Sequence, residues 1–195
     1  SAPMMSAGLV DSAGNMQLYD GGLRFRDSAG AIVADHIPAD EYATWIGEAS
    51  LRESYMKAPY FKPKGFPEGL YRVGPLGRLN VADRCGTLLA DAELEEFRAR
   101  FGHPAHSAFL YHYARLIEII YALERIEMLL EMPKILEPQV RATAGVNSLE
   151  GFGMIEAPRG VLIHHYKVNE QGAITWANLI VATGHNALAI GKGVQ

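Results

Sequence analysis

A run of helical periodicity from Ser107 to about Glu131 constrains the fold more than any other part of this chain. Its apolar side chains recur at helical spacing and cover most of the circumference, a pattern typical of a helix buried within a bundle. These side chains are Leu110, Tyr113, Leu116, Ile117, Ile120, Tyr121 and Leu123. At 1.5 Å per residue, a helix of about 25 residues spans roughly 37 Å. We therefore expect one helix to cross an entire domain.

Short runs bounded by turn residues predict β-strands towards both ends of the chain. Glycine-containing turns separate the runs in the first part, as in hairpins, and the runs in the last part alternate between apolar and polar side chains. The first set is Met16–Tyr19, Leu23–Arg26 and Ile32–Ala34. The second set is Gly153–Glu156, Gly160–Val168 and Ala173–Val181, with residues 169–172 as the turn between the last two.

The middle of the chain predicts two further helices and a packed loop. Two acidic residues soon after Pro38 would lie in the first turn of a helix over Ala39–Ser50, where the helix dipole favours them. The segment Asp91–Phe101 is typical of a short amphipathic helix that ends at Gly102. Prolines and glycines interrupt residues 55–80, whose aromatic side chains indicate a packed loop rather than disorder.

We therefore expect an α+β fold, mainly helical, with β-hairpins over residues 1–35, helices over 36–150, and strands followed by the start of a helix over 151–195. The chain has 195 residues, 49% of them hydrophobic, which suffices for one domain or a large part of one. A formal charge of −4 with interspersed signs provides no basic surface for nucleic acid. Charged residues interrupt the apolar runs before bilayer length, and no signal peptide is recognisable, so we expect no membrane span.

The segment from Glu156 to His164 contains the most specific candidate for function. Pro158 fixes the path of the chain and Gly160 relaxes it, so Arg159 between them would project from a turn. A planar, permanently charged guanidinium in such a turn suits an arginine held over a site. The structural alternative is that Arg159 forms an ion pair with Glu156 or another carboxylate.

The string Glu-Ala-Pro-Arg-Gly over residues 156–160, with a histidine four residues after the glycine, resembles a block of [NiFe]-hydrogenase large subunits. Residues 72–80, Arg-Val-Gly-Pro-Leu-Gly-Arg-Leu-Asn, resemble the cytoplasmic, cofactor-linked branch of that family, particularly the NAD-reducing enzymes. The resemblance runs along nearly the whole chain. It implies an α+β, mainly helical fold with the long buried helices of the large-subunit type and small antiparallel β-sheets.

The thiolate ligands of that family are missing. Its members hold nickel and iron with two Cys-x-x-Cys pairs, whereas this chain has one cysteine, Cys85. A centre with four thiolate ligands cannot be assembled from one cysteine. We therefore expect an internal fragment that lacks both metal-binding ends, in which Cys85 is a buried structural thiol. One cysteine also forms no disulfide framework, which fits a reducing cytosol.

The resemblance assigns roles to four residues. Arg159 would stand over the nickel–iron centre near its open coordination position, and Pro158 would wall the same pocket. Thr183 would donate a hydrogen bond to an iron-bound cyanide, or cap the helix that follows it. Leu179 would offer its main-chain carbonyl to a magnesium ion, whose other ligands lie outside the fragment. We therefore expect no metal bound to the fragment itself.

Other polar residues have a structural alternative beside a functional one. On a strand, His164 and His165 would point to opposite faces; each is more readily a satisfied histidine than a metal ligand, although the family counterpart of His164 lies near the active centre. His112, Arg115 and Glu118 follow at spacing three along one side of the long helix. They would form either a polar relay or, as we favour, a structural network.

For the intact protein the resemblance implies reversible H₂ oxidation at a NiFe(CN)₂CO centre, with magnesium nearby. Its partners in the cytoplasm would be an iron–sulfur small subunit together with NAD(P)-reducing diaphorase subunits. The chain has no Gly-x-Gly-x-x-Gly fingerprint, so nicotinamide and flavin would bind those partners. The physiological acceptor, the direction of turnover and oxygen tolerance stay open.

Two alternatives remain. The quinone-side large subunit of respiratory complex I shares the Glu-Ala-Pro-Arg-Gly block and has no nickel cysteines, but residues 72–80 and 182–186 resemble hydrogenases instead. A stand-alone interaction domain without chemistry would need no arginine presented as at position 159.

Overall fold

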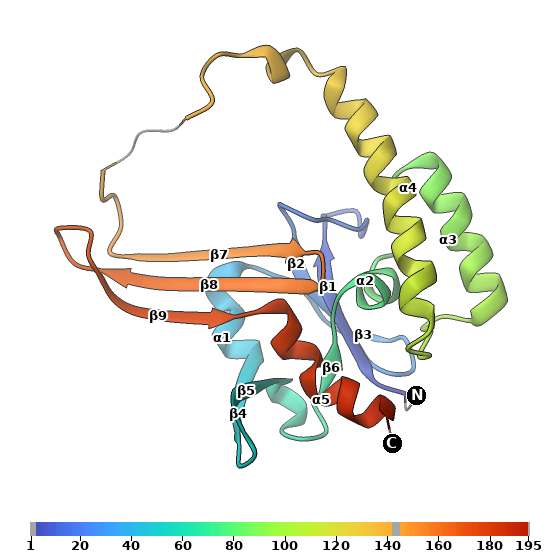
Figure 1. The fold of residues 1–195 in the computed structure, drawn as a ribbon, viewed down its shortest axis with the longest axis horizontal. Helices are drawn as coiled ribbons and strands as arrows, with labels where there is room; N and C mark the ends of the chain where they lie inside the picture. Colours follow the sequence, from blue (N-terminus) through green and yellow to red (C-terminus); the bar gives the residue numbers. More distant parts are fainter. Residues whose placement is uncertain (1–2, 142–144, 195) are drawn as a thin grey trace.

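Three small sheets organise residues 3–141 and 145–194, which are the residues that the computed structural model describes (Figure 1). The first sheet has the strand order β3-β2-β1-β6, with β1 and β6 parallel and the other pairs antiparallel. Its strands are β1 (Met5–Val10), β2 (Gly22–Arg26), β3 (Ile32–Ile37) and β6 (Tyr71–Arg72). The second sheet is the hairpin of β4 (Ile46–Leu51) and β5 (Ser54–Phe61).

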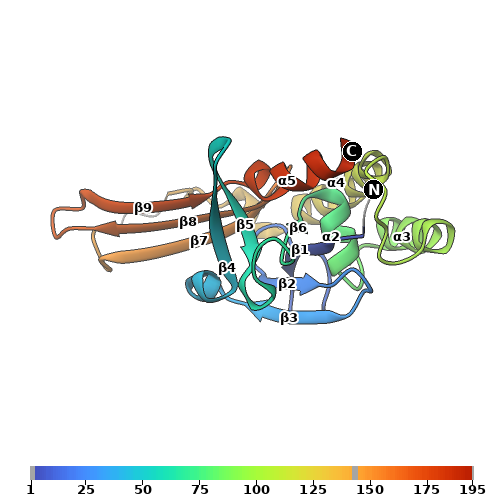
Figure 2. The same cartoon turned by 90° about the horizontal axis from the view of Figure 1, so that it is seen from below.

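The third sheet is antiparallel, in the order β7-β8-β9, and extends to one side of the molecule (Figure 2). Its strands are β7 (Glu150–Ala157), β8 (Gly160–Val168) and β9 (Ile174–Ile180). The α+β class with small, mainly antiparallel sheets is therefore confirmed.

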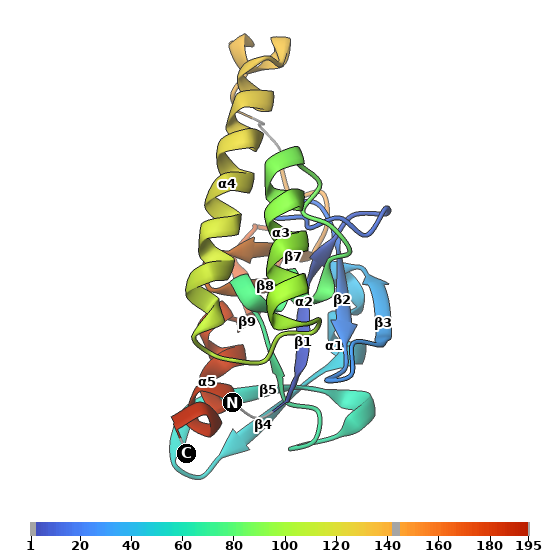
Figure 3. The ribbon, with the colours of Figure 1, turned by 90° about the vertical axis from the view of Figure 1, so that its right-hand side faces the viewer.

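Helices connect and cover these sheets. The α-helices are α1 (Tyr42–Trp45), α2 (Pro75–Val81), α3 (Leu88–Phe101), α4 (Leu110–Leu130) and α5 (Ala182–Val194), and the short 3-10 turns are η1 (Ala39–Glu41), η2 (Lys62–Lys64) and η3 (Pro133–Leu136). Helix α2 packs between β1 and α4, and every one of its residues is buried. Helices α3 and α4 lie side by side (Figure 3). None of the helices in the described residues is long and apolar enough to cross a membrane.

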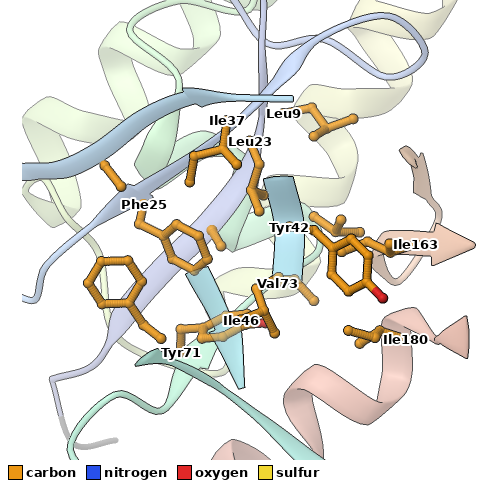
Figure 4. Packing of buried hydrophobic residues seen from close by; sticks show 14 of the residues in the cluster. Leu9, Leu23, Phe25, Ile37, Tyr42, Ile46, Tyr71, Val73, Ile163 and Ile180 are labelled. Atoms are coloured by element: carbon orange, nitrogen blue, oxygen red, sulfur yellow. The ribbon is translucent and has the colours of Figure 1, made fainter. Parts of the chain in front are cut away.

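Two clusters of buried side chains hold these elements together. The first joins the four-stranded sheet to β8 and β9, with Leu9, Phe25 and Ile163 fully buried within it (Figure 4). The second lies among α2, α3 and α4 around Phe97 and Ile117. Burial of each such side chain stabilises the fold by about 1.5–3 kcal/mol. The clusters fix α2 between β1 and α4, and α2 adjoins the candidate site.

Several elements are confirmed as the sequence predicts them. The helix over Asp91–Phe101 is part of α3 and ends at Gly102, whose φ of 81° requires glycine. The long helix is α4, and the second and third C-terminal strands are β8 and β9, joined by a turn with Gly172 at a φ of 78°. The hairpin of β2 and β3 is also confirmed.

Three predictions are wrong. The helix over Ala39–Ser50 ends at Trp45, because the next residues pair with β5 as the buried start of β4. Residues 55–80 are not a loop, since most of them form β5, β6 and α2. Met16–Tyr19 makes a single bridge, Val10–Met16, and the strand beside it is β1. Every residue of β1 is buried, so it lacks the alternation that identifies a half-exposed strand.

The long helix is only partly covered in the described chain. Only Ala114, Ile117 and Tyr121 of α4 are buried in the described chain. Apolar side chains on the rest of its surface are more than half exposed, namely Leu116, Ile119, Leu123, Ile126, Met128 and Leu130. Apolar side chains therefore lie on several sides of α4, and the rest of the described chain covers only one stripe of them.

We expect Gly160→Ala to destabilise the chain by about 2 kcal/mol or more, because the added methyl has no space and the backbone does not suit it. Gly160 has a φ of 132°, and a Cβ there would lie 2.2 Å from Val73 Cγ2 and 2.8 Å from the nitrogen of Gly74. Denaturant unfolding measures the change. Gly153→Ala, in the same hairpin with no atom within 4 Å of the added Cβ, is the matched control. Equal stability of the two variants would contradict the tight contact.

Candidate active site

A cavity of about 340 Å³ lies where β6, α2, α4, the β7–β8 turn and α5 meet. Its lining residues are Arg72, Pro75, Ala108, Tyr111, His112, Arg115, Arg159, Thr183, Asn186, Ala189 and Ile190. Three of them are arginines and none is a carboxylate. Within the described part of the chain, the charged groups that line the cavity are therefore all cationic, beside neutral polar and apolar ones, an arrangement that favours negatively charged or electron-rich ligands.

Arg159 enters this cavity from the tip of the β7–β8 hairpin. Ala157 and Gly160 form the last pair of the ladder, so residues 158 and 159 are the two-residue turn. The Arg159 Nε donates a 2.9 Å hydrogen bond to Thr183 Oγ1, and no described carboxylate lies within ion-pair distance of it. The alternative of an Arg159–Glu156 ion pair is therefore wrong for this structure.

Glu156 instead binds Arg78, on the buried side of the hairpin. The Arg78 Nη1 lies 2.6 Å from Glu156 Oε2, and its Nε lies 2.5 Å from Glu118 Oε1. Burial disfavours the charge of Arg78, but Glu156 and Glu118 together outweigh it and raise the pKa of the guanidinium. Arg78 is thus a permanent cation in the wall behind the turn.

Thr183 and Asn186 lie one turn apart on α5, on the side that faces the cavity. Helix α5 begins at Ala182, so Thr183 lies in its first turn rather than in the capping position ahead of it. Its hydroxyl accepts from Arg159 and keeps its own proton for another acceptor. Asn186 accepts from the nitrogen of Val73 at 3.0 Å and donates to the carbonyl of Val73 at 3.2 Å, which joins α5 to the segment ahead of α2.

The long helix supplies the opposite wall. His112 and Arg115 line the cavity, while Glu118, one turn further, bonds to Arg78. The spacing of three therefore does place these side chains along one side of α4, and Glu118 belongs to a structural network. Tyr111 donates its hydroxyl to the carbonyl of Val73 at 3.0 Å, and burial raises its pKa to about 12.

The other candidates lie away from this cavity. The carbonyl of Pro158 accepts from Arg78 at 3.3 Å, but Pro158 is not among the lining residues. His164, on β8, bonds to the hydroxyl of Tyr166 at 3.0 Å and does not line the cavity. Leu179, on β9, borders a second cavity that also contains Glu48. The position of a magnesium ligand at Leu179 stays a prediction.

Two further histidines are buried inside the structure. His165 is buried between the hydroxyl of Tyr42, 3.0 Å from its Nδ1, and Glu150, 2.7 Å from its Nε2. His185 is buried under α5 with its Nδ1 2.6 Å from the hydroxyl of Tyr71, and burial lowers its pKa to about 4. His185 is therefore neutral at pH 7, and its role is to hold α5 against the first core cluster.

Comparison with protein families matches residues 25–189 to the nickel-dependent hydrogenases, so the chain belongs to that family. Among curated relatives, it is 43% identical over 188 residues to one chain of the F420-non-reducing hydrogenase vhu of Methanococcus voltae, and the match covers 96% of this chain and 44% of that relative. It is 40% identical over 196 residues to the beta chain of the NAD-reducing hydrogenase HoxS of Cupriavidus necator, covering 99% and 40%.

Among solved structures, an NAD⁺-reducing [NiFe]-hydrogenase in the H₂-reduced state matches all of this chain and 43% of its own, with a TM-score of 0.93 and 41% identity. The Ni-Fe-Se hydrogenase of D. vulgaris Hildenborough matches at a TM-score of 0.60 and 23% identity, which indicates a shared fold. The resemblance to hydrogenase large subunits is thus confirmed. The chain spans less than half the length of these relatives.

The residues of this chain fit the surroundings of a nickel–iron centre but not its ligand shell. Burial first, and then Asp91, raise the pKa of Cys85 to about 12, so this thiol is neutral at pH 7. The described residues contain no group of three or more His, Cys, Asp or Glu side chains that could hold a metal ion. Arg159 and Thr183 nevertheless offer N–H and O–H donors to electron-rich ligands from one side of the cavity.

We therefore expect the purified chain to contain neither nickel nor iron in stoichiometric amount, because one buried thiol cannot replace four thiolates. Elemental analysis after dialysis measures this directly. Either metal at one per chain would show that this chain has a ligand set of its own.

Proposed function

We propose that this chain is the part of a [NiFe]-hydrogenase large subunit that forms one wall of the active-site cavity. The intact enzyme would interconvert H₂ with protons and electrons and pass the electrons through an iron–sulfur small subunit to NAD(P)-reducing subunits. One observation supports this most strongly: Arg159 and Thr183, 24 residues apart in the sequence, meet in one cavity that no described carboxylate lines.

The Arg159 guanidinium would act as a fixed donor fork. Its Nε is bound to Thr183, which orients the plane of the group and leaves the two Nη atoms for the cavity. Preorganised donors aimed at developing negative charge lower a barrier because they need no reorganisation during the reaction. When bound, the nickel–iron centre with its cyanide and carbonyl ligands would supply the splitting of H₂, and its thiolates would come from outside this chain.

Thr183 would connect Arg159 to a ligand of the iron through two hydrogen bonds. Its oxygen accepts from Arg159, so its proton is free for a cyanide nitrogen. An acceptor left unpaired once it is buried costs about 1–3 kcal/mol. Pro75, Ala189 and Ile190 on the same wall are apolar and would exclude water from it.

The electron acceptor is the finer part of this proposal. The relatives include both F420-non-reducing and NAD-reducing hydrogenases, while the structural match at a TM-score of 0.93 is an NAD⁺-reducing enzyme. We propose NAD(P), bound by partner subunits, in the cytoplasm. A magnesium ion at the carbonyl of Leu179 would belong to the same intact protein. These matches give no support to a metal-free relative of complex I or to an interaction domain without chemistry.

In the full-length enzyme at full metal occupancy, we expect Arg159→Lys to lower turnover by about 10²–10³-fold, as does the removal of one oxyanion donor. Lysine keeps the charge but loses the planar fork and the Nε bond to Thr183. H₂ oxidation with an artificial acceptor measures the rate. Arg52→Lys, an exposed arginine in the β4–β5 turn, is the control. Near-normal turnover of the Arg159→Lys enzyme would return Arg159 to a structural role.

Thr183→Val should shift the cyanide stretching bands in the infrared spectrum and lower turnover less than Arg159→Lys does. The substitution keeps the shape of the side chain and leaves the metal ligands themselves unaltered, but it removes the proposed hydrogen bond to cyanide together with the acceptor of the Arg159 Nε. Thr175→Val, which removes an exposed hydroxyl on β9, is the matched control and should leave the bands in place. Unchanged cyanide bands in the Thr183→Val enzyme would exclude the proposed hydrogen bond.

A further inference from the structure

The turn that contains Arg159 is held by its main chain rather than by the Arg159 side chain. Three successive carbonyl oxygens accept hydrogen bonds from side chains of distant segments. Ala157 and Pro158 accept from Arg78, at 3.0 Å and 3.3 Å, and Arg159 accepts from Asn186 at 3.4 Å. In the described residues the Arg159 side chain has one partner, Thr183. The direction of its guanidinium therefore depends on how firmly these carbonyls are held.

Arg78 uses its whole guanidinium for this purpose. Its Nε binds one oxygen of Glu118, its Nη2 binds the other oxygen and Pro158, and its Nη1 binds Glu156 and Ala157. These are five acceptors for five N–H donors. The side chains of Arg78 and Glu156 are 3% and 0% exposed, so no water replaces a lost bond. A lysine could not reproduce this arrangement, since its three donors radiate from one nitrogen.

The same guanidinium joins two walls of the cavity. Glu118 follows Arg115 by three residues on α4, and Arg115 lines the cavity opposite the turn. Glu156 precedes the turn on β7 and also accepts from the nitrogen of Leu9 at 3.0 Å. A shift of Arg78 would thus move the turn relative to α4, and with it the separation of Arg159 from the groups that it faces.

We propose that Arg78 is a positioning residue for Arg159: it binds the carbonyls of Ala157 and Pro158, fixes the β7–β8 turn against α4 and so sets the place of the Arg159 guanidinium in the cavity. This inference rests on the proposed function of Arg159. It differs from a purely structural ion pair in one measurable respect. A structural role predicts that losses of activity at Arg78 and Arg159 combine independently, whereas a positioning role predicts that the loss at Arg78 disappears once Arg159 is gone.

The test is a double-mutant cycle in the full-length, metal-loaded enzyme, with Arg78→Lys, Arg159→Lys and both together. We expect Arg78→Lys to lower kcat by about 10–10²-fold, as misplacement by about 1 Å can. The apparent KM for H₂ should change much less. The double variant should turn over at the rate of Arg159→Lys alone. A double variant slowed by the product of the two single effects would overturn the proposal.

Arg98→Lys is the control for the loss of a guanidinium that binds main-chain carbonyls, although Arg98 is only half-buried. Arg98 also binds main-chain carbonyls, those of Leu79, Ala82 and Asp83, but none in the turn. It should leave kcat close to that of the parent enzyme. A fall in kcat as large as that of Arg78→Lys would show that any loosening of α2 lowers the rate, and would overturn the specific role of Arg78.

Crystal structures of the variants separate this inference from the proposed function. In Arg78→Lys the Arg159 Nε should lose its hydrogen bond to Thr183 Oγ1, and an unmoved Arg159 would overturn the inference whatever the rate. Should the Arg78→Lys enzyme fail to assemble, Glu118→Gln keeps the shape of its side chain and weakens the hold on Arg78, and the same displacement is expected in smaller measure. Normal turnover of Arg159→Lys would refute the catalytic role of Arg159. The position of Arg159 in the Arg78→Lys crystal structure would still decide whether Arg78 positions it.

Discussion

The buried ion pair of Arg78 and Glu156 is the interaction on which the rest of this structure depends. It joins β1, α2, α4 and the β7–β8 hairpin at one point, through Leu9, Glu118 and the carbonyls of the turn. Breaking a buried pair by removing one partner costs about 3–5 kcal/mol, because the other charge is left without water. Replacing both partners with apolar groups is often neutral. The pair therefore contributes more by fixing the relative positions of these segments than by lowering the free energy of folding.

A hydrogen-bonded guanidinium gives that geometry in a way that apolar packing could not. Apolar contacts are not directional, so a packed core would allow the turn to adopt several heights above α4. Five N–H donors in one plane define one height and one tilt. Close contact of Gly160 with Val73 and Gly74 then fixes the lateral position of the hairpin. Together they place Arg159 without any support from its own side chain beyond Thr183.

Those parts of the fold that depend on local pattern could be predicted from the sequence. Helices α3 and α4 and the strands β8 and β9 have strong periodicity and clear turn residues, so their existence did not require knowledge of their neighbours. The failures concern segments whose form is decided by a distant partner. β4 is a strand because it pairs with β5, although its preceding residues favour a helix, and β1 is buried on all sides and has no visible period.

The same distinction between local pattern and distant partner applies to the residues of the candidate site. Arg159 and Thr183 could be selected from short motifs, and they meet because β8 and β9 are antiparallel: the chain leaves the cavity at Gly160 and returns to it at Ile180. The supporting roles could not be assigned. Arg78 lies 81 positions before Arg159 and Asn186 lies 27 positions after it; both belong to the motifs at residues 72–80 and 182–186, but nothing in those motifs shows that these side chains bind the turn. Pattern reading therefore identifies the residues that face a ligand more readily than those that hold them in place.

The residues that line the cavity and those that support it also differ in charge. Arg72, Arg115 and Arg159 line it without a described carboxylate, so their mutual repulsion opposes assembly of the empty cavity. The carboxylates that offset them, Glu118 and Glu156, lie behind the wall, where Arg78 binds both. Arg78 and its two glutamates together carry one net negative charge, so the three lining arginines are offset only in part and keep a positive potential directed into the cavity. In this chain the buried carboxylates that partly offset the lining arginines belong to the same network that positions the turn.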